Sequence, residues 1–384
     1  MDPALFLTTP PPLDPAWVAH EQANDLWNIS RPVDIKENQK VYSQTCKRRN
    51  AQLLASRDEH LAEGLVLTDS KLLARDSHLI PIRTYHPAQH ACGPPEPQSV
   101  GPEDMGRPTI VYYHGGGLKV GDLDSEDLSC RRLCKGLGCT VYSVEYRLLP
   151  DFTADQAIED AIDAFGWITQ MCKASRLIIV GSSSGGHLAA QVSQHYKHAS
   201  SFPWAGKPVI HGVCLRSPVT CDPYENGENI PQAWKGRHHS MSPAFYTSIQ
   251  ARPMTNPGEK AVRHALPLEA ESFEGLPRTF CQLTTNDVYY SDGICYAAAL
   301  MEAGVEVRLD IVTGWPHTFW LKAPLLERAE KAEMDFIAGV RWLLEAEGLE
   351  EPETVKISQR FIVPDKSFQA MDPIEFGKAF DRVS

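Results

Sequence analysis

The chain has 384 residues, of which 42% are hydrophobic and 22% are charged, and its formal net charge is −12. This composition is typical of a globular protein and excludes a generally disordered chain. The acidic balance repels nucleic-acid phosphates and supplies no basic face for anionic lipids, so neither is expected as a partner. The length accommodates one large α/β domain with a lid, or two ordinary domains.

The N-terminal stretch does not have the pattern of a targeting segment. It carries an acid at Asp2 and no basic region, and prolines at 10–12 interrupt its short apolar run, whereas a signal peptide needs the opposite pattern. No stretch approaches the roughly 18–20 apolar residues that span a bilayer. The ten cysteines are scattered without a C-x-x-C pair, which favours reduced thiols over a zinc site. We therefore expect a cytoplasmic protein without a membrane span or a bound metal.

Strand and helix patterns alternate along most of the chain. Two N-terminal segments, near 14–28 and 37–63, have the spaced apolar residues of helices. Short apolar runs then predict strands, and the amphipathic stretches between them predict helices. The expected strands cover 65–69, 79–85, 109–113, 140–146, 176–180, 209–215, 278–283 and 305–312. The later helices are expected over 123–137, 154–171, 187–196, 289–303 and 322–347.

This alternation predicts an α/β fold, with a mostly parallel sheet covered by helices on both faces. Residues 219–264 lack periodicity and are rich in Pro, Asn, Gly and aromatic residues, which indicates an insertion. We expect an N-terminal helical lid segment (1–63), a main domain (64–350) whose insertion completes the lid, and a polar C-terminal surface tail (351–384).

A small-residue turn follows the apolar run 176–180. Gly181-Ser182-Ser183-Ser184-Gly185 fits the pattern G-x-S-x-G between a strand and a helix, which is the context of a nucleophile elbow. The glycines are needed because a nucleophilic serine sits on a sharp, strained turn where bulky neighbours would clash. A plain Gly/Ser turn is the alternative, and the flanking strand and helix favour Ser183 as a nucleophile.

A second motif, His114-Gly115-Gly116-Gly117, directly follows the strand expected over 109–113. Without side chains in the way, backbone N–H groups can point at one oxygen and stabilise the charge of a tetrahedral intermediate. The predicted oxyanion-hole donors are the N–H groups of Gly116, Gly117 and Ser184. The alternative is a flexible glycine loop, and His114 is expected to brace the loop rather than to act as a base.

A serine nucleophile needs a base, and the base needs an orienting carboxylate. Where the serine lies on such a strand–turn–helix elbow, the three catalytic residues follow along the chain in the order serine, acid, histidine. His317 follows the last expected strand through a tight turn, Gly314-Trp315-Pro316, and is the predicted base. The other downstream histidines fall on the helix after the elbow, in a strand or in the insertion.

The carboxylate is expected just past the strand over 278–283. Asp287 stands there and is the predicted orienting acid. Asp292 is the competitor, although it falls in the first turn of the next helix, where an acid also favours the helix dipole. Asp310 lies inside an expected strand and is placed less well to reach the histidine.

Together these residues resemble the hormone-sensitive-lipase-like branch of the α/β hydrolases, a family of carboxylesterases. The resemblance covers about residues 79–345 and rests on YYHGGG (112–117), EYRLLPD (145–151), GSSSGGHLAA (181–190), LTTNDVYYSD (283–292) and GWPHTF (314–319). It implies an α/β-hydrolase fold with an eight-stranded sheet and a helical lid, and a catalytic role for the main domain. It also implies hydrolysis of carboxylic esters without a metal or an organic cofactor.

Two residues depart from the pattern of this branch. Ser182 stands where an acid usually precedes the nucleophile, and Leu118 stands where an aromatic residue usually follows H-G-G-G. Because both can reshape the pocket, the substrates of relatives do not carry over. Related fungal biosynthetic hydrolases also catalyse cyclisation, condensation or acyl transfer. An acyl transferase or cyclase of secondary metabolism is therefore the alternative function, and a non-catalytic small-molecule receptor is a third.

The expected partner is a small-molecule ester or acyl substrate, and a homodimer stays open. Aromatic residues of the lid either indicate an apolar substrate or pack the lid's own core, and both interpretations stand. These residues are Trp17, Trp27, Trp234, Phe245 and Tyr246.

Overall fold

A computed structural model describes residues 1–29, 32, 34–88, 107–172, 176–197, 210–221, 230–248 and 266–345. The expected C-terminal tail and parts of the expected insertion (222–229 and 249–264) lie outside these residues. Within the described ranges, no helix has both the length and the apolar character needed to cross a membrane.

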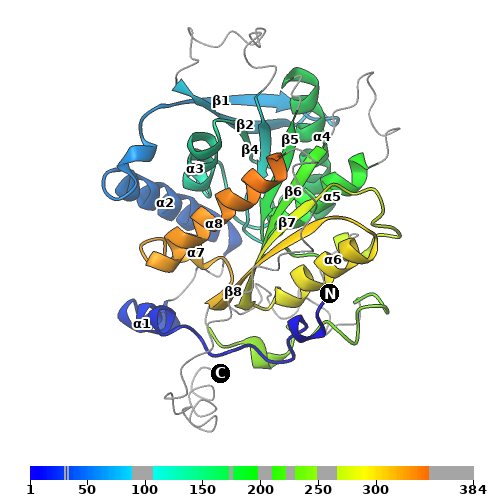
Figure 1. The fold of residues 1–384 in the computed structure, drawn as a ribbon. Helices are drawn as coiled ribbons and strands as arrows, with labels where there is room; N and C mark the ends of the chain where they lie inside the picture. Colours follow the sequence, from blue (N-terminus) through cyan, green and yellow to red (C-terminus); the bar gives the residue numbers. More distant parts are fainter. Residues whose placement is uncertain are drawn as a thin grey trace.

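One sheet of eight strands forms the centre of the molecule, in the order β1-β2-β4-β3-β5-β6-β7-β8 (Figure 1). β1 pairs with β2 and β2 with β4 in antiparallel fashion, and the neighbours from β4 to β8 pair in parallel. The strands are β1 (Leu65–Leu73), β2 (Leu79–Pro87), β3 (Thr109–Tyr113), β4 (Thr140–Val144), β5 (Leu177–Ser182), β6 (Ile210–Arg216), β7 (Thr279–Asn286) and β8 (Val307–Pro316). The predicted mostly parallel, eight-stranded sheet is confirmed.

Helices cover both faces of this sheet, and every residue of β3 and β5 is therefore buried. α4 (Ala154–Cys172), α5 (Ser184–Tyr196) and α6 (Tyr290–Glu302) lie on one side, and α3 (Asp127–Leu137) and α8 (Glu327–Leu344) on the other (Figure 1). Each set packs into its own apolar core against the sheet. Short 3-10 turns lie at Pro3–Leu5, Leu26–Asn28, Glu59–Leu61, Pro243–Phe245 and Pro267–Glu269.

Several helix boundaries differ from those predicted; for example, the helix expected over 123–137 begins at Asp127, and the one expected over 37–63 is α2 (Ile35–Leu54). α5 begins at Ser184 rather than at 187, because the carbonyl of Ser183 already accepts the N–H of His187 and starts the first turn. The helix expected over 322–347 is divided into α7 (Phe319–Lys322) and α8. Pro324, which has no N–H to donate, lies between them.

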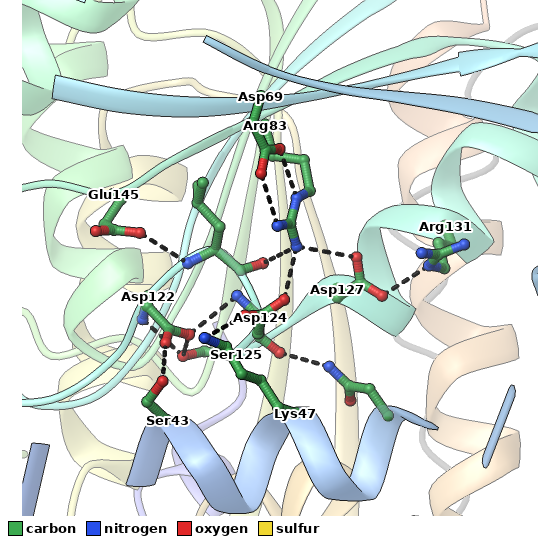
Figure 2. A network of polar contacts seen from close by, with 12 residues as sticks. Ser43, Lys47, Asp69, Arg83, Asp122, Asp124, Ser125, Asp127, Arg131 and Glu145 are labelled. Carbon is green, nitrogen blue, oxygen red and sulfur yellow. Dashed lines mark hydrogen bonds and ion pairs between the residues drawn. The ribbon is translucent and has the colours of Figure 1, made fainter. Parts of the chain in front are cut away.

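The N-terminal helix α2 (Ile35–Leu54) is fastened to the loop that precedes α3 (Figure 2). Ser43 of α2 donates a hydrogen bond to Asp122, and Lys47 Nζ lies 3.5 Å from Asp124 Oδ2. Arg83 of β2 reaches the same loop, with Nη1 2.7 Å from Asp124 Oδ1. The loop is therefore held between α2 and the antiparallel end of the sheet.

The first 29 residues, including α1 (Pro15–Ala23), run past the edge at which the parallel strands end (Figure 1). The carbonyl of Pro11 accepts a 2.8 Å hydrogen bond from Asn286 Nδ2 at the end of β7. The N–H of Asp14 donates to the carbonyl of Gly314 in β8 at 2.8 Å. These contacts bring the start of the chain to the carboxyl ends of the last two strands, where ligands of such sheets bind.

The prediction of a tight turn at Gly314-Trp315-Pro316 is wrong, because β8 continues as a strand through Pro316. The pairing between the strands advances by two residues on β7, from Thr284 to Asn286, and by four on β8, from Val312 to Pro316. β8 thus bulges by two residues, and Gly314 has a φ of +82° within this bulge. His317, the residue that follows β8, is therefore oriented by the bulged end of the strand rather than by a turn.

Candidate active site

Ser183 alone makes the turn between β5, which ends at Ser182, and α5, which begins at Ser184. Its φ is +54° and its ψ is −121°, a conformation that residues with a side chain rarely adopt. Its N–H donates to the carbonyl of Arg216 at 2.8 Å, and its own carbonyl accepts the N–H of Val219 at 3.2 Å. Backbone hydrogen bonds to the end of β6 and to the loop that follows it therefore hold the strained turn in place.

The glycines on either side of the turn allow the backbones to approach each other closely. A Cβ atom on Gly181 would lie 2.0 Å from the carbonyl oxygen of Gly185. A Cβ atom on Gly185 would lie 2.0 Å from the carbonyl oxygen of Tyr113 in β3. No side chain fits at either position, which is the steric requirement expected of a nucleophile elbow.

Ser183, His317 and Asp287 form one continuous chain of hydrogen bonds. Ser183 Oγ lies 2.8 Å from His317 Nε2, and His317 Nδ1 lies 2.7 Å from Asp287 Oδ2. The three residues directly follow the carboxyl ends of β5, β8 and β7. Asp287 is fully buried, and the relative exposure of Ser183 is only 7%. The structure thus brings together the three side chains proposed from the sequence.

Two further groups hold the carboxylate of Asp287. Thr284 Oγ1 donates to Oδ2 at 3.0 Å, and the N–H of Tyr289 donates to Oδ1 at 2.9 Å. The ring of Tyr289 also packs edge-on against His317, with the ring centroids 5.0 Å apart. Sequence reasoning missed both residues, although their closeness to Asp287 in LTTNDVYY was an available signal.

The two competing acids are engaged elsewhere. Asp292 Oδ1 lies 2.9 Å from His238 Nε2, so this carboxylate pairs with a histidine of the insertion. Asp310 Oδ2 accepts a 2.9 Å hydrogen bond from Gln282, and burial raises the pKa of its carboxyl group. Neither acid takes part in the hydrogen bonds that join Ser183 to Asp287.

The glycine loop after β3 lies directly beside Ser183. A Cβ atom on Gly115 would come within 3.3 Å of Ser183 Cβ. Gly116 and Gly117 have φ values of +128° and +64°. At Gly116 a Cβ atom would lie 1.9 Å from the carbonyl oxygen of Val120. The loop therefore requires glycine for its conformation, and not only for flexibility.

Ser184 joins this loop to α5. Its Oγ accepts a 3.3 Å hydrogen bond from the N–H of Leu118, and it is the first residue of the helix. The N–H groups of a first helical turn have no partner within the helix and form the positive end of the helix dipole. The region beside Ser183 is thus bordered by a glycine loop and a helix N-terminus.

His114 braces the loop from its buried side. Its ring stacks on that of Tyr146, with the ring centroids 4.4 Å apart. The hydroxyl of Tyr146 donates to the carbonyl oxygen of His114 at 2.6 Å. A Cβ atom on Gly121 would lie 2.3 Å from His114 Nδ1, so a glycine also backs the ring. This packing supports the structural role expected for His114.

The aromatic residues of the expected lid are mostly buried in apolar cores that they share with the main domain. Trp17, Trp234 and Phe245 are each at most 5% exposed and belong to apolar cores, whereas Trp27 is 41% exposed. Tyr246 is partly buried against the main core. These positions favour core packing over direct contact with a ligand.

The buried cysteines have the character of small apolar residues. Eight cysteines in the described part of the chain are buried, and none of the eight forms a disulfide. Burial raises the pKa of several of their thiols, including those of Cys130 and Cys139. In the same part of the chain, no group of three or more His, Cys, Asp or Glu side chains is arranged to hold a metal ion.

Comparison with known proteins identifies the family. Residues 110–321 match the model described as the alpha/beta hydrolase fold. The ethyl acetate hydrolase of Pseudomonas putida is 30% identical over 278 residues, which cover 69% of this chain and 79% of the relative. The versiconal hemiacetal acetate esterase of Dothistroma septosporum is 25% identical over 256 residues, covering 62% and 74%. The solved structure of vibralactone cyclase superposes with a TM-score of 0.67 at 22% identity, covering 88% of this chain and 96% of that one.

The chain belongs to the alpha/beta hydrolase fold family. The fold predicted from the sequence is thereby confirmed. The enzyme class predicted from the sequence, a carboxylic ester hydrolase, is also the class for which the first two of these relatives are named.

Proposed function

We propose that this protein hydrolyses a carboxylic ester through an acyl-enzyme formed on Ser183. The observation that carries the proposal is the chain of hydrogen bonds from Ser183 Oγ through His317 to Asp287, at 2.8 and 2.7 Å. A serine hydroxyl is a weak nucleophile until a base takes its proton, and an imidazole bonded to a buried carboxylate is such a base.

In the first step, Ser183 Oγ attacks the carbonyl carbon of the ester while His317 Nε2 takes the hydroxyl proton. Asp287 accepts the Nδ1 proton of His317 in a hydrogen bond, which sets the tautomer and stabilises the imidazolium. The imidazolium then protonates the departing alcohol. Water repeats the sequence on the acyl-enzyme, and the carboxylic acid leaves.

The negative charge of each tetrahedral intermediate falls on the former carbonyl oxygen. We assign its stabilisation to the N–H groups of Gly116, Gly117 and Ser184, which belong to the glycine loop and the helix start beside Ser183. Each such donor contributes about 3 kcal/mol to lowering the barrier. The positive φ values of both glycines support this assignment, because they keep the loop backbone turned beside Ser183.

We propose that the N-terminal segment (1–63) and the insertion (219–264) form a lid over a main catalytic domain (64–350). Trp17 Nε1 donates to Ser248 Oγ at 3.1 Å, which joins α1 to the insertion. The contacts of Pro11 with Asn286 and of Asp14 with Gly314 attach the first part of this lid to the strand ends that carry the acid and the base. We propose a small, apolar ester as the substrate beneath this lid.

A second candidate function uses the same triad. An alcohol, amine or carbon nucleophile of the substrate would accept the acyl group from Ser183 in place of water. The protein would then act as an acyl transferase or a cyclase in secondary metabolism. The buried cysteines that form no disulfide support a reducing, cytoplasmic location for either activity.

The test is hydrolysis of p-nitrophenyl esters of increasing acyl length by the wild type and by Ser183→Ala, with labelling by a fluorophosphonate followed by intact mass. We expect turnover in the wild type, none in the variant, and one label on Ser183. Labelling without release of acid, together with product formation when an alcohol is added, would favour the transferase. Absence of both labelling and turnover in folded protein would exclude the enzyme and leave the receptor.

A further inference from the structure

Glu126 is a buried carboxylate that the mechanism above does not use. It is the N-cap residue of α3, and its relative exposure is 4%. A carboxylate in such a place is costly unless donors satisfy its oxygens. Within the part of the chain that the structure describes, the groups that donate hydrogen bonds to Glu126 belong to segments around the nucleophile.

The carboxylate joins the glycine loop to the nucleophile elbow. Glu126 Oε1 accepts the N–H of Gly115 at 2.8 Å and the hydroxyl of Ser182 at 2.9 Å. Its other oxygen, Oε2, accepts the hydroxyl of Tyr112. Gly115 immediately precedes the proposed oxyanion donors, and Ser182 immediately precedes Ser183. A single oxygen atom therefore links the segment that stabilises the charge to the segment that makes the attack.

The link spans a narrow space. A Cβ atom on Gly115 would lie 3.1 Å from the carbonyl oxygen of Ser182 and 3.4 Å from Glu126 Oε1. The glycine loop follows β3 and the elbow follows β5, so the sheet fixes the position at which each segment begins. The contacts of Glu126 with Gly115 and Ser182 join the glycine loop, which lies beyond the end of β3, to the last residue of β5.

Glu126 is itself held from outside. The preceding residues are bonded to α2 and β2 through Asp122 and Asp124, as described above (Figure 2). The following residue, Asp127, lies 2.6 Å from Arg131 Nε within α3. Asn50 of α2 adds a 2.7 Å hydrogen bond to the carbonyl of Asp124. These contacts leave the carboxylate of Glu126 little freedom to follow the glycine loop if that loop moves.

We propose that Glu126 is a positioning residue that sets the distance between the oxyanion donors and Ser183. It does so by accepting the Gly115 N–H and the Ser182 hydroxyl on one oxygen. The role rests on the proposed function, because it matters only if Ser183 attacks a carbonyl. It is a geometric role, which any side chain with an acceptor oxygen at the same point can fill.

Three substitutions test the geometry. Glu126→Gln keeps an acceptor oxygen at the same length, and its amide can donate to the Tyr112 oxygen, so most of kcat should remain. Glu126→Asp keeps the charge but withdraws the acceptor by one methylene, and Glu126→Ala removes it. A misplacement of about 1 Å at a catalytic group costs on the order of 100-fold. We expect kcat to fall by about 10-fold to 100-fold in Glu126→Asp and in Glu126→Ala, with KM changed less than about twofold.

The control is Asp58→Ala. Asp58 is also a carboxylate of 4% exposure, but it pairs with Arg57 and Arg132, away from the glycine loop. This variant should unfold at lower urea and keep the kcat of the wild type. Affinity for a boronic acid, which forms a tetrahedral adduct on the serine, should fall in the Asp and Ala variants of Glu126 by the same factor as kcat/KM.

The rate of fluorophosphonate labelling gives the same comparison without ester turnover. If wild-type protein neither turns over esters nor takes the label, the proposed function fails and this role fails with it. If the wild type reacts and Glu126→Ala reacts equally fast, the positioning role alone is overturned. An inactive Glu126→Gln beside an active Glu126→Asp would also overturn it, because charge and not position would then be the requirement.

Discussion

Nε2 of His238 lies 2.9 Å from Oδ1 of Asp292. The other oxygen of this carboxylate accepts the N–H groups of Thr220 and Cys221 at 2.8 and 2.9 Å. Asp292 thus fastens the residues after β6 and a histidine of the insertion to the first turn of α6. The pair of His238 and Asp292 resembles the histidine and the acid of a catalytic triad, but here it holds a chain segment in place.

This difference predicts opposite effects for the two neighbouring acids. Asp287→Asn should lower kcat on the order of 10³- to 10⁴-fold, because it presents the wrong tautomer of His317. Asp292→Asn should lower the free energy of unfolding by about 1–3 kcal/mol, because buried donors lose their charged acceptor, and should keep kcat. Steady-state kinetics and urea unfolding of both variants check this. Equal loss of kcat in folded Asp292→Asn would contradict the assignment of Asp287.

Gly116→Ala should abolish most activity. The added methyl group would overlap the carbonyl of Val120 at 1.9 Å, and φ at this position is +128°. The loop must move, and displacing one oxyanion donor costs on the order of 10²- to 10³-fold in kcat. Gly304→Ala is the matched control: its φ is +79°, but nothing lies within 4 Å of the added Cβ. It should cost about 1 kcal/mol of stability and no activity. A Gly116→Ala enzyme with wild-type kcat would remove Gly116 from the oxyanion hole.

Glu333 predicts a pH dependence of stability. It lies on α8, 2.7 Å from the buried guanidinium of Arg216, whose charge also lies over the rings of Trp320 and Phe336. Burial alone would raise the pKa of Glu333, but the charges of Arg216 and Arg132 outweigh it, and the pKa is lowered. A lowered folded-state pKa means that the stabilisation is complete above the unfolded value, about 4.3, and is lost as the pH falls through the folded value.

Glu333→Gln should therefore be less stable than the wild type by about 3–5 kcal/mol at pH 7. The difference should shrink as the pH falls below about 4.3. Urea unfolding of both proteins at several pH values measures it directly. A difference that stays constant down to pH 3 would show that hydrogen-bond geometry, and not the charge of Glu333, supplies the stabilisation.

Removal of residues 1–13 should change the preference for acyl length. Leu5 in this segment is buried, and its carbonyl accepts the hydroxyl of Tyr290 at 2.8 Å. If the segment is one wall of the substrate site, the ratio of kcat/KM for the octanoyl to the acetyl ester should fall several-fold, because apolar contact with the longer chain is lost. Tyr290→Phe, which removes one hydrogen bond and leaves the wall, is the control. An unchanged ratio in the truncated enzyme would exclude the segment from the site.

The sheet and the local motifs were predictable because their determinants are local. Buried strands are short apolar runs, and the G-x-S-x-G and H-G-G-G patterns follow such runs directly. The bulge in β8 was missed because the groups that bond to it lie outside the strand: Gly314 donates its N–H to Thr285 Oγ1, and its carbonyl accepts the N–H of Asp14, 300 residues earlier in the chain. A tight turn and a bulge both place a glycine at positive φ, so the sequence alone does not distinguish them.

Glu126 was missed for a related reason. It lies 11 residues after Gly115 and 56 before Ser182, and no periodic pattern connects the three. The one signal was Ser182 itself, where a residue that is usually acidic in the hormone-sensitive-lipase-like branch has become a hydroxyl donor. A missing charge at one position was a reason to look for a carboxylate elsewhere in the same space.

The strained turn at Ser183 has a practical consequence. Because backbone groups of Arg216 and Val219 hold this residue, and its side chain does not, alanine at position 183 should leave the elbow and the surrounding walls unchanged. Such a protein can bind its natural ester and has no means of consuming it. The Ser183→Ala protein could be incubated with an extract of metabolites, washed and then denatured. It would release the intact bound compound, which mass spectrometry would identify, so the inactive variant would capture its own substrate.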